Sequence, residues 1–283
     1  MSRRDAARFI ILSAIWGSSF LFIKLGLLGG MGPLTLVMLR LLLGAAAMAL
    51  LAWKLGEHLP PGWRIIGVIF LVALVNNALP FSLITWGEQH IPSSLTAILN
   101  SSVPLFTVVI SHFALSDERF TWSRVAGVTM GFLGVFILFA PDLLTQGLSG
   151  AVVGQLAIVL ATLGYATGSV ITRKYLQGVP SATLAALQLG FALLWMLPPV
   201  LLWEKPWTLQ PTALAWFSVL WLGFLSTGLA YFIFFQLIKS IGATPTTLVT
   251  YVIPVFAVIF GVIFLDERLY WAQLAALPVI NVD

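Results

Sequence analysis

Long apolar segments separated by short polar stretches most restrict how this chain can fold. A hydrocarbon core about 30 Å thick requires roughly 20 apolar residues per helix. Boundaries at charged, Gly and Pro positions give ten such segments: 8–28, 33–53, 63–87, 92–115, 121–140, 150–175, 181–203, 212–237, 243–265 and 270–282. The sequence therefore predicts an all-α membrane protein with ten transmembrane helices. The tenth segment is too short to span comfortably, so the last helix is expected to be truncated.

The composition agrees with this prediction. Of the 283 residues 60% are hydrophobic and 8% are charged, which is typical of membrane bundles. The net charge of +4 would suggest nucleic-acid binding in a soluble protein, but here all Lys and Arg residues except Lys24 and Arg40 lie at segment ends, where membrane topology explains them. The absence of Cys excludes disulfides, thiol catalysis and cysteine-ligated metals. No Gly-rich phosphate loop occurs, so ATP is not an expected cofactor.

The Lys and Arg residues also predict the orientation of the segments, because the cytoplasmic ends of transmembrane helices carry an excess of them. One set of alternate ends carries Arg3, Arg4, Arg8, Lys54, Arg64, Arg119, Arg124, Arg173, Lys174 and Lys239. The other set carries only Lys205 and Arg268. We therefore expect both termini to face the cytoplasm, with the chain in the inner, or plasma, membrane of a bacterium.

A pattern in the first half of the chain returns in the second half. At offsets of 149 or 150 residues the matched pairs are Asn100 and Thr250, Pro104 and Pro254, Asp117 and Asp266, Trp122 and Trp271, Trp16 and Tyr165, and Lys24 and Arg173. Each copy would hold five helices, an odd number, so the second copy would enter the membrane from the opposite side. The expected fold is two inverted five-helix repeats, residues 1–145 and 146–283.

Several short motifs stand in register on these segments. They are Trp16-Gly17 with Phe20 and Lys24, Pro33 with Arg40, and Pro104 or Pro254 ahead of an Asp-Glu-Arg. Together they resemble the drug/metabolite transporter superfamily in its EamA-type, ten-helix form, and within it the YddG-like exporters of amino acids. The resemblance implies export of small metabolites through a central cavity between the halves. Leu187-Gln188 stands where the second copy would match Arg40, so strict symmetry of the site is not expected.

Two cations lie inside predicted helices and are candidates for a charge role. Lys24 lies roughly 22 Å along its segment and Arg40 roughly 10 Å along the next, which places both in the outer half of the membrane. A charge inside a bundle is costly unless it faces a partner or water. Lys24 is also explained by snorkelling to the interface. Arg40 could be tied to helix-end carbonyls or to Glu88, or it could attract a solute carboxylate from above the site.

Polar and aromatic residues in the middle of the segments predict the binding site. At the places where an inverted-repeat carrier binds its solute, the candidates are Trp16, Asn76, Asn77, Asn100, Tyr165, Tyr231, Thr250 and Tyr251. Their amides and hydroxyls can bond the ammonium and carboxylate of an amino acid, while the aromatic faces accept its side chain. Buried amides serve alternatively as packing contacts between helices.

Two prolines are candidate hinges. Pro104 and Pro254 each remove the hydrogen bond to the carbonyl four residues earlier, that of Asn100 or Thr250. We expect both prolines to bend their helices near the midplane, so that the freed carbonyls can face a solute.

The predicted function is export of small organic solutes, chiefly amino acids and among them aromatic or other apolar ones, by alternating access. No Asp or Glu falls in the middle third of a segment, although proton or sodium coupling usually uses a buried carboxylate. Coupled and facilitated transport therefore both stay open.

Several alternatives remain at this point. The solute could be another neutral or anionic metabolite or a drug, and the chain could be a passive channel or a membrane-embedded enzyme. Three scattered His residues supply no catalytic or metal constellation, so an enzyme, a metal and a cofactor are not expected. The expected partners are the solute and the lipid bilayer, not nucleic acid, with the chain a monomer or a weak homodimer.

Overall fold

The computed structural model describes residues 1–115, 122–242, 245–246 and 248–268, and this part of the chain is helical without a β-strand. The first half comprises α1 (Arg3–Leu28), α2 (Pro33–Lys54), α3 (Trp63–Ala73), the π-helix η1 (Leu74–Ala78), α4 (Leu79–Gly87), α5 (Ser93–Asn100), α6 (Val103–Ala114) and α7 (Trp122–Gln146). The second half comprises α8 (Gly150–Tyr175), α9 (Ser181–Pro199), the π-helix η2 (Val200–Glu204), the 3-10 helix η3 (Pro206–Thr208), α10 (Ala213–Leu220), the π-helix η4 (Trp221–Leu229), α11 (Ala230–Ile241) and α13 (Val249–Leu265).

In the part of the chain that the structure describes, eight helical stretches are long and apolar enough to cross a membrane. They are Arg3–Leu28, Pro33–Lys54, Trp63–Gly87, Ser93–Ala114, Arg124–Thr145, Gly150–Tyr175, Ser181–Glu204 and Ala213–Ile241. These stretches fall on the first eight predicted segments, which confirms an all-α, multi-pass membrane protein. The shorter apolar helix α13 has 17 residues and falls on the ninth segment. The tenth segment, 270–282, lies outside the described residues.

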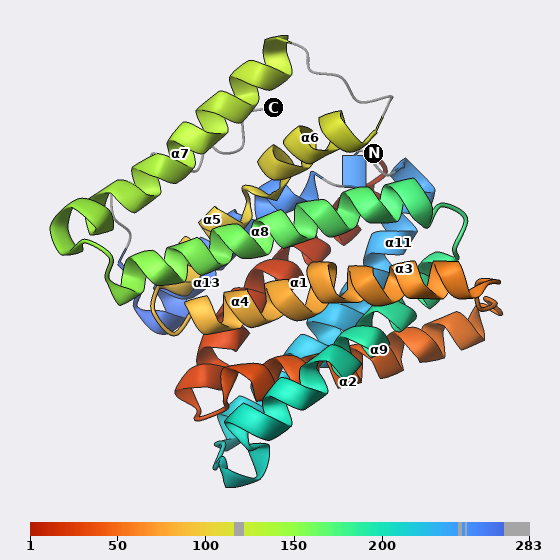
Figure 1. Ribbon diagram of the computed structural model, residues 1–283, viewed down its shortest axis with the longest axis horizontal. Coiled ribbons are helices and arrows are strands. Elements are labelled where there is room, and N and C mark those ends of the chain that lie inside the picture. The colour runs from red at the N-terminus through yellow and green to blue at the C-terminus, as the bar shows by residue number, and fades with distance from the viewer. Residues whose placement is uncertain (116–121, 243–244, 247, 269–283) are drawn as a thin grey trace.

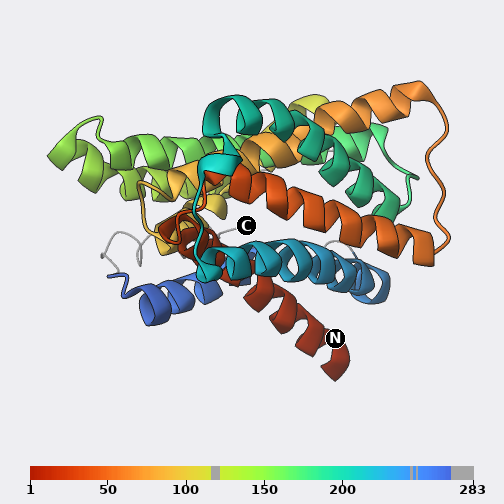
Figure 2. The same ribbon diagram turned by 90° about the horizontal axis from the view of Figure 1, so that it is seen from below.

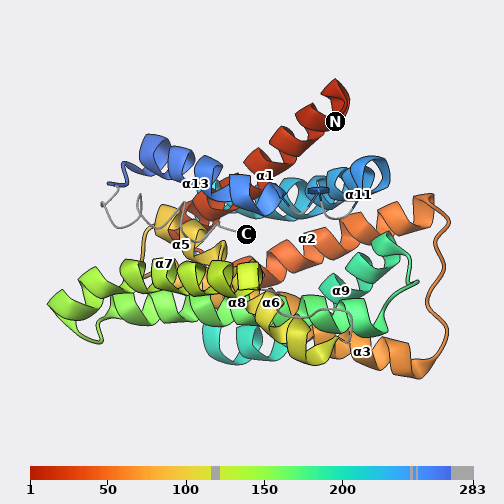
Figure 3. The same cartoon turned by 90° about the horizontal axis from the view of Figure 1, so that it is seen from above.

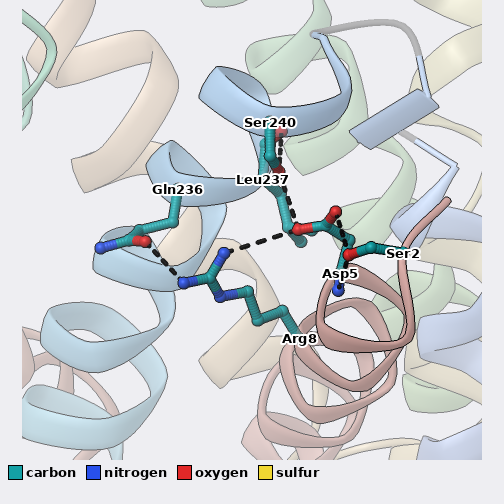
Figure 4. Close-up of polar contacts among 6 residues, drawn as sticks. All are labelled: Ser2, Asp5, Arg8, Gln236, Leu237 and Ser240. Carbon is teal, nitrogen blue, oxygen red and sulfur yellow. Dashed lines mark hydrogen bonds and ion pairs between the residues drawn. The ribbon is translucent and has the colours of Figure 1, made fainter.

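The first helix begins at Arg3, earlier than the predicted position 8, because a polar network holds its first turn (Figure 4). The Ser2 hydroxyl accepts a hydrogen bond from the Asp5 backbone N–H at 3.1 Å, as an N-cap does. The Asp5 carboxylate accepts from the Ser240 hydroxyl at 3.0 Å, and Arg8 donates to the Gln236 side chain at 2.8 Å. These bonds join the start of α1 to the end of α11.

The first helix of each half packs mainly against helices of the other half. Helix α1 of the first half lies along α13, α10 and α11 of the second half, and α8 of the second half lies along α4 and α6 of the first half. The central pair is α2 with α9. Figure 1 labels these helices, and the turned views in Figures 2 and 3 show α11 and α13 on one side of the bundle and α3, α8 and α9 on the other, with α2 between them.

Glycines permit the closest of these helix crossings. A Cβ added to Gly17 of α1 would lie 2.7 Å from the Phe256 Cβ and 2.9 Å from the Ile253 carbonyl oxygen on α13. A Cβ added to Gly87 of α4 would lie 3.1 Å from the Gly154 carbonyl oxygen on α8. In lipid, where no hydrophobic effect drives helices together, small residues let backbones approach and gain dispersion contacts.

Glutamates at the ends of helices cap the first turns of other helices. Glu57, which follows α2, accepts from the Thr183 backbone N–H at the start of α9. Conversely, Glu204 at the end of η2 accepts from the backbone N–H groups of Leu34 and Thr35 at the start of α2. Each carboxylate satisfies unpaired N–H groups and meets the positive end of a helix dipole. The two caps fix α2 and α9 to each other at both ends.

Replacement of Gly17 by Ala should destabilise the protein, because the added methyl meets the α13 backbone and overpacking of this kind costs about 1–3 kcal/mol. In detergent we expect the apparent melting temperature to fall by several degrees. The matched control is Gly67→Ala on α3, where an added Cβ meets nothing within 4 Å. Equal melting temperatures for both variants would contradict the close crossing of α1 and α13.

Candidate functional site

A cavity of about 330 Å³ lies in the middle of the bundle. Helices from both halves form its wall, so it lies between residues far apart in the sequence. The lining residues are Trp16, Ser19, Phe20, Ile23, Arg40, Asn76, Phe81, Ile84, Ala97, Asn100, Ser101, Val103, Pro104, Tyr165, Ser169, Ser226, Tyr231, Thr250 and Ile253. The mixture of apolar faces with a few polar groups is typical of small-molecule sites.

The structure brings six of the eight predicted binding residues to this cavity: Trp16, Asn76, Asn100, Tyr165, Tyr231 and Thr250. The other two lie elsewhere. Asn77 is 2% exposed and is not part of the cavity wall. Tyr251 lines a second cavity of about 730 Å³. Successive residues of a helix point in directions about 100° apart, so only one member of each adjacent pair faces the first cavity.

The second cavity adjoins the first and leads toward one end of the bundle. Val103, Pro104, Ser169 and Thr250 line both cavities. The second is also lined by Arg124 in the first turns of α7 and Arg173 in the last turn of α8. We call the end of the bundle at these two arginines the basic end. A solute in the first cavity therefore has a route toward the basic end.

Two π-helical segments flank the first cavity, one in each half. Asn76 belongs to η1, and Ser226 belongs to η4. The two segments interrupt the third and eighth spans at equivalent places. Helix η1 begins at residue 74, and the offset of 149 residues between the two copies brings this position to residue 223, within η4. A π-helix leaves some backbone groups without their usual partner, and such segments occur frequently at functional sites. The sequence signals neither segment.

The backbone of η4 is stabilised by side chains of the cavity wall. The Trp16 indole N–H donates to the Ser226 carbonyl at 3.1 Å. The Thr227 hydroxyl donates to the Leu222 carbonyl at 2.9 Å and accepts from Arg40 Nε at 3.3 Å. These bonds hold Trp16 and Arg40 in fixed places, so the wall that a solute would meet is preorganised.

Arg40 lies in the cavity wall itself, although the sequence suggested a position above the site. Its guanidinium carbon is 4.2 Å from the centre of the Phe81 ring, which gives a cation–π contact. The alternative tie to Glu88 is not formed, since the only ion pair within 4 Å among the described residues joins Arg8 and Asp5. The guanidinium is therefore available to a solute anion.

The fourth span is broken beside the cavity. Helix α5 ends at Asn100, residues 101 and 102 form a turn, and Pro104 is the second residue of α6. The Asn100 side-chain oxygen is buried without a hydrogen-bond partner in the described chain. Pro254 differs, because α13 continues through it. The predicted bends thus have different surroundings, and a hinge role for either proline stays a prediction.

The aromatic residues of the cavity contact one another. The Trp16 ring lies edge-on to the Tyr231 ring, with centroids 6.3 Å apart, and the Tyr165 ring is 6.3 Å from that of Phe81. Such pairs are worth about 0.5–1.5 kcal/mol beyond area burial. The cavity therefore has aromatic as well as amide groups in its wall, which suits a solute with one polar and one apolar end.

Lys24 and Glu88 lie outside the cavity wall. The Lys24 ammonium donates to the backbone carbonyls of Glu88 and Ile91 and is partly buried, so it reaches the connection between α4 and α5 and snorkelling to the interface stays a prediction. Glu88 is fully buried. Both residues lie beyond Ile23 and Ile84, at the end of the cavity away from the basic end.

Several lining residues were not predicted from the sequence: Ser19, Phe81, Ser169 and Ser226. Helical periodicity could have found two of them, because Ser19 follows Trp16 by three residues and Ser169 follows Tyr165 by four. For Ser226 no such signal exists, since its place depends on the π-helix. Among the described residues no three metal-ligating side chains come together.

The chain matches the EamA-like transporter family twice, over residues 6–140 and over residues 152–281. The inner membrane transporter YedA of Escherichia coli (strain K12), described as uncharacterized, is 29% identical over 95% of this chain and 85% of its own length. A probable amino-acid metabolite efflux pump of Salmonella typhimurium is 26% identical over 97% of this chain and 91% of its own. A solved crystal structure shares the fold, with a TM-score of 0.66, 20% identity and coverage of 99% of this chain and 94% of that one.

The route from the cavity to the basic end can be tested with thiol labelling, because the chain has no native Cys. We expect a Ser19→Cys variant to react with a small hydrophilic maleimide added at the basic end. The matched control is Ser18→Cys. Ser18 is 4% exposed, does not line the cavity and accepts a hydrogen bond from the Trp221 indole. Reaction of both thiols at the same rate would contradict the described cavity.

Proposed function

Because the chain belongs to the EamA-like transporter family, we propose that this membrane transporter exports amino acids, or other small solutes that carry a carboxylate, across the bacterial inner membrane. The observation that carries the proposal is Arg40 in the wall of the central cavity. A guanidinium binds a carboxylate through two parallel hydrogen bonds, and without such a partner its place in the bundle would be costly.

The other cavity groups complete a site for an amino acid. The unpartnered Asn100 oxygen can accept from the ammonium group. Trp16, Tyr165 and Tyr231 supply faces for an apolar or aromatic side chain. The name of the Salmonella typhimurium relative, a probable amino-acid metabolite efflux pump, supports this class of solute. Neutral or anionic metabolites and drugs remain the alternative solutes.

We infer that transport proceeds by alternating access between two inverted five-helix repeats, residues 1–145 and 146–283. Three observations support this. The family matches the chain twice. The π-segments η1 and η4 stand at equivalent places. Glu57 caps α9 as Glu204 caps α2. The cavity leads to one end of the bundle, as expected for one of the two states. A ten-helix topology with cytoplasmic termini belongs to this proposal.

Two other classes have less support. A membrane-embedded enzyme would need a nucleophile with its base or a metal, and the described residues of the cavity wall include no His, Asp or Glu. A passive channel would need a route open at both ends. We therefore favour a carrier, coupled or facilitated, that acts as a monomer or weak homodimer.

Counterflow in proteoliposomes tests the solute class. We expect phenylalanine, or another amino acid of a panel, to exchange, whereas the amine that lacks its carboxylate should not. Arg40→Gln should abolish this preference, because the amide cannot form the paired charged bonds. Asn100→Ala and Trp16→Ala should each lower exchange several-fold, with Gly67→Ala as control. Equal exchange of amino acid and amine by the unmodified protein would contradict the proposal.

The hinge hypothesis makes a separate prediction. Pro104→Ala restores an N–H that can bond the Asn100 carbonyl, so the break between α5 and α6 should stiffen. We expect transport to slow several-fold while solute affinity changes little. Pro254→Ala serves for comparison, since α13 already runs through this position. Unchanged rates in both variants would remove the prolines from the transport cycle.

A further inference from the structure

The end of the cavity away from the basic end is closed by contacts among three parts of the chain. Lys24 of α1 donates to the carbonyls of Glu88 and Ile91, in the connection between α4 and α5. Glu267, which follows α13, accepts from the backbone N–H groups of Ser93 and Ser94 at 2.7 and 2.9 Å. We call this set of contacts the closed end. It joins α1, the α4–α5 connection and the chain after α13.

The Glu88 carboxyl is buried inside the closed end. The residue is 0% exposed, and neither carboxyl oxygen has a hydrogen-bond partner among the described residues. The Lys24 ammonium bonds the Glu88 backbone, and the Glu88 side chain forms no ion pair within 4 Å in the described chain. An ionised carboxylate in such surroundings is strongly disfavoured, and the group takes up a proton instead. The geometry therefore favours a neutral carboxylic acid here.

The charged groups near Glu88 do not reverse this conclusion. Burial raises the pKa of Glu88 well above its usual range, the Lys24 ammonium opposes that shift, the Glu267 carboxylate adds to it, and the Arg40 guanidinium weakly opposes it. Lys24 belongs to α1, Glu267 to the chain after α13, and Arg40 to α2. From α8 the neighbours at Gly87 are the Ile158 side chain and the Gly154 carbonyl, which cannot neutralise a carboxylate.

We propose that Glu88 is a proton-binding site that favours the closed end when protonated and the open end when ionised. Opening would bring water to the carboxyl and leave it beside Lys24, where the ionised form is stable. The proton comes from water on that side of the membrane and returns to it. The site therefore adjusts the balance between the two states and moves no net proton across the bilayer. This inference rests on the proposed alternating-access function and on the expected topology, in which the closed end faces outward.

The sign of the pH effect follows from the direction of the pKa shift. The carboxyl binds its proton more tightly when the end is closed, so closure is fully favoured at external pH below the usual Glu pKa of about 4.3. The preference is lost as pH rises through the raised pKa. Because one proton is involved, the ratio of closed to open states falls by at most about tenfold per pH unit. Acid outside should hold the transporter closed on that side.

Labelling of intact bacterial cells tests the proposal. A Ser19→Cys thiol lies in the cavity wall, so a membrane-impermeant maleimide added outside reaches it only when the closed end opens. External pH is varied from about 5 to 8, and rates are normalised to Gln210→Cys, an exposed position beyond η3, to remove the intrinsic pH dependence of thiols. We expect the normalised rate to rise at least several-fold as external pH increases.

Variants of Glu88 separate this site from other carboxyl groups. In the Glu88→Gln background the normalised rate should be low and independent of pH, because the amide stays neutral. Glu88→Asp should keep a pH response, and this second variant serves if the first fails to fold. The matched control is Glu204→Gln, which removes a hydrogen-bonded carboxylate that caps α2 and should leave the response intact.

The possible outcomes are distinct. A pH-independent rate in the Glu88 protein, or the same pH response after Glu88→Gln, would overturn the proposal. Amino-acid counterflow measured in parallel keeps the two proposals apart. A pH response that depends on Glu88, with no amino-acid exchange, supports the proton site and contradicts only the proposed solute. Exchange that is accompanied by labelling independent of Glu88 contradicts only the proton site.

Discussion

The hydrogen-bonding requirement of the backbone governs this structure. Inside a bilayer an unpaired N–H or C=O costs several kcal/mol, so irregular backbone is tolerated only where protein or a cavity supplies partners. The π-helices η1 and η4 and the turn after α5 all border the central cavity. Trp16 and Thr227 supply partners for carbonyls of η4. The cavity and the irregular backbone therefore depend on each other.

Helix ends follow the same requirement. Three glutamates cap first turns that belong to other helices: Glu57 caps α9, Glu204 caps α2, and Glu267 caps α5. A carboxylate in this position satisfies N–H groups and the helix dipole at once. Two of the caps hold the central pair of α2 and α9. The third lies at the closed end, beside Glu88, where a change of state would have to break it.

In the transport cycle that we propose, the distribution of charge in the bundle separates solute binding from gating. Arg40 is in the cavity wall, where a solute can reach it. Lys24 and Glu88 lie beyond the wall. There the Lys24 ammonium donates to backbone carbonyls, and the Glu88 carboxyl has no hydrogen-bond partner among the described residues. Glu88 follows directly after the third span, Trp63–Gly87, so its burial agrees with the absence of acids from the middle of the segments. The acid acts on the end of the pathway and not on the solute.

The sequence by itself determined the membrane-spanning class and the first eight segments, and six of the eight binding residues that it proposed line the cavity, because apolar length and helical periodicity depend on local chemistry alone. It placed Trp16 and Tyr165 near the middle of their helices and Asn100 within the fourth span. Only the tertiary structure decided that Asn76 and not Asn77 faces the cavity and that Arg40 is in its wall. It also decided that the Glu88 carboxyl is buried without a hydrogen-bond partner among the described residues. These facts depend on how helices rotate and cross, and on π-segments whose cost is offset by distant side chains. Such contacts join residues far apart in the chain, and no local pattern records them.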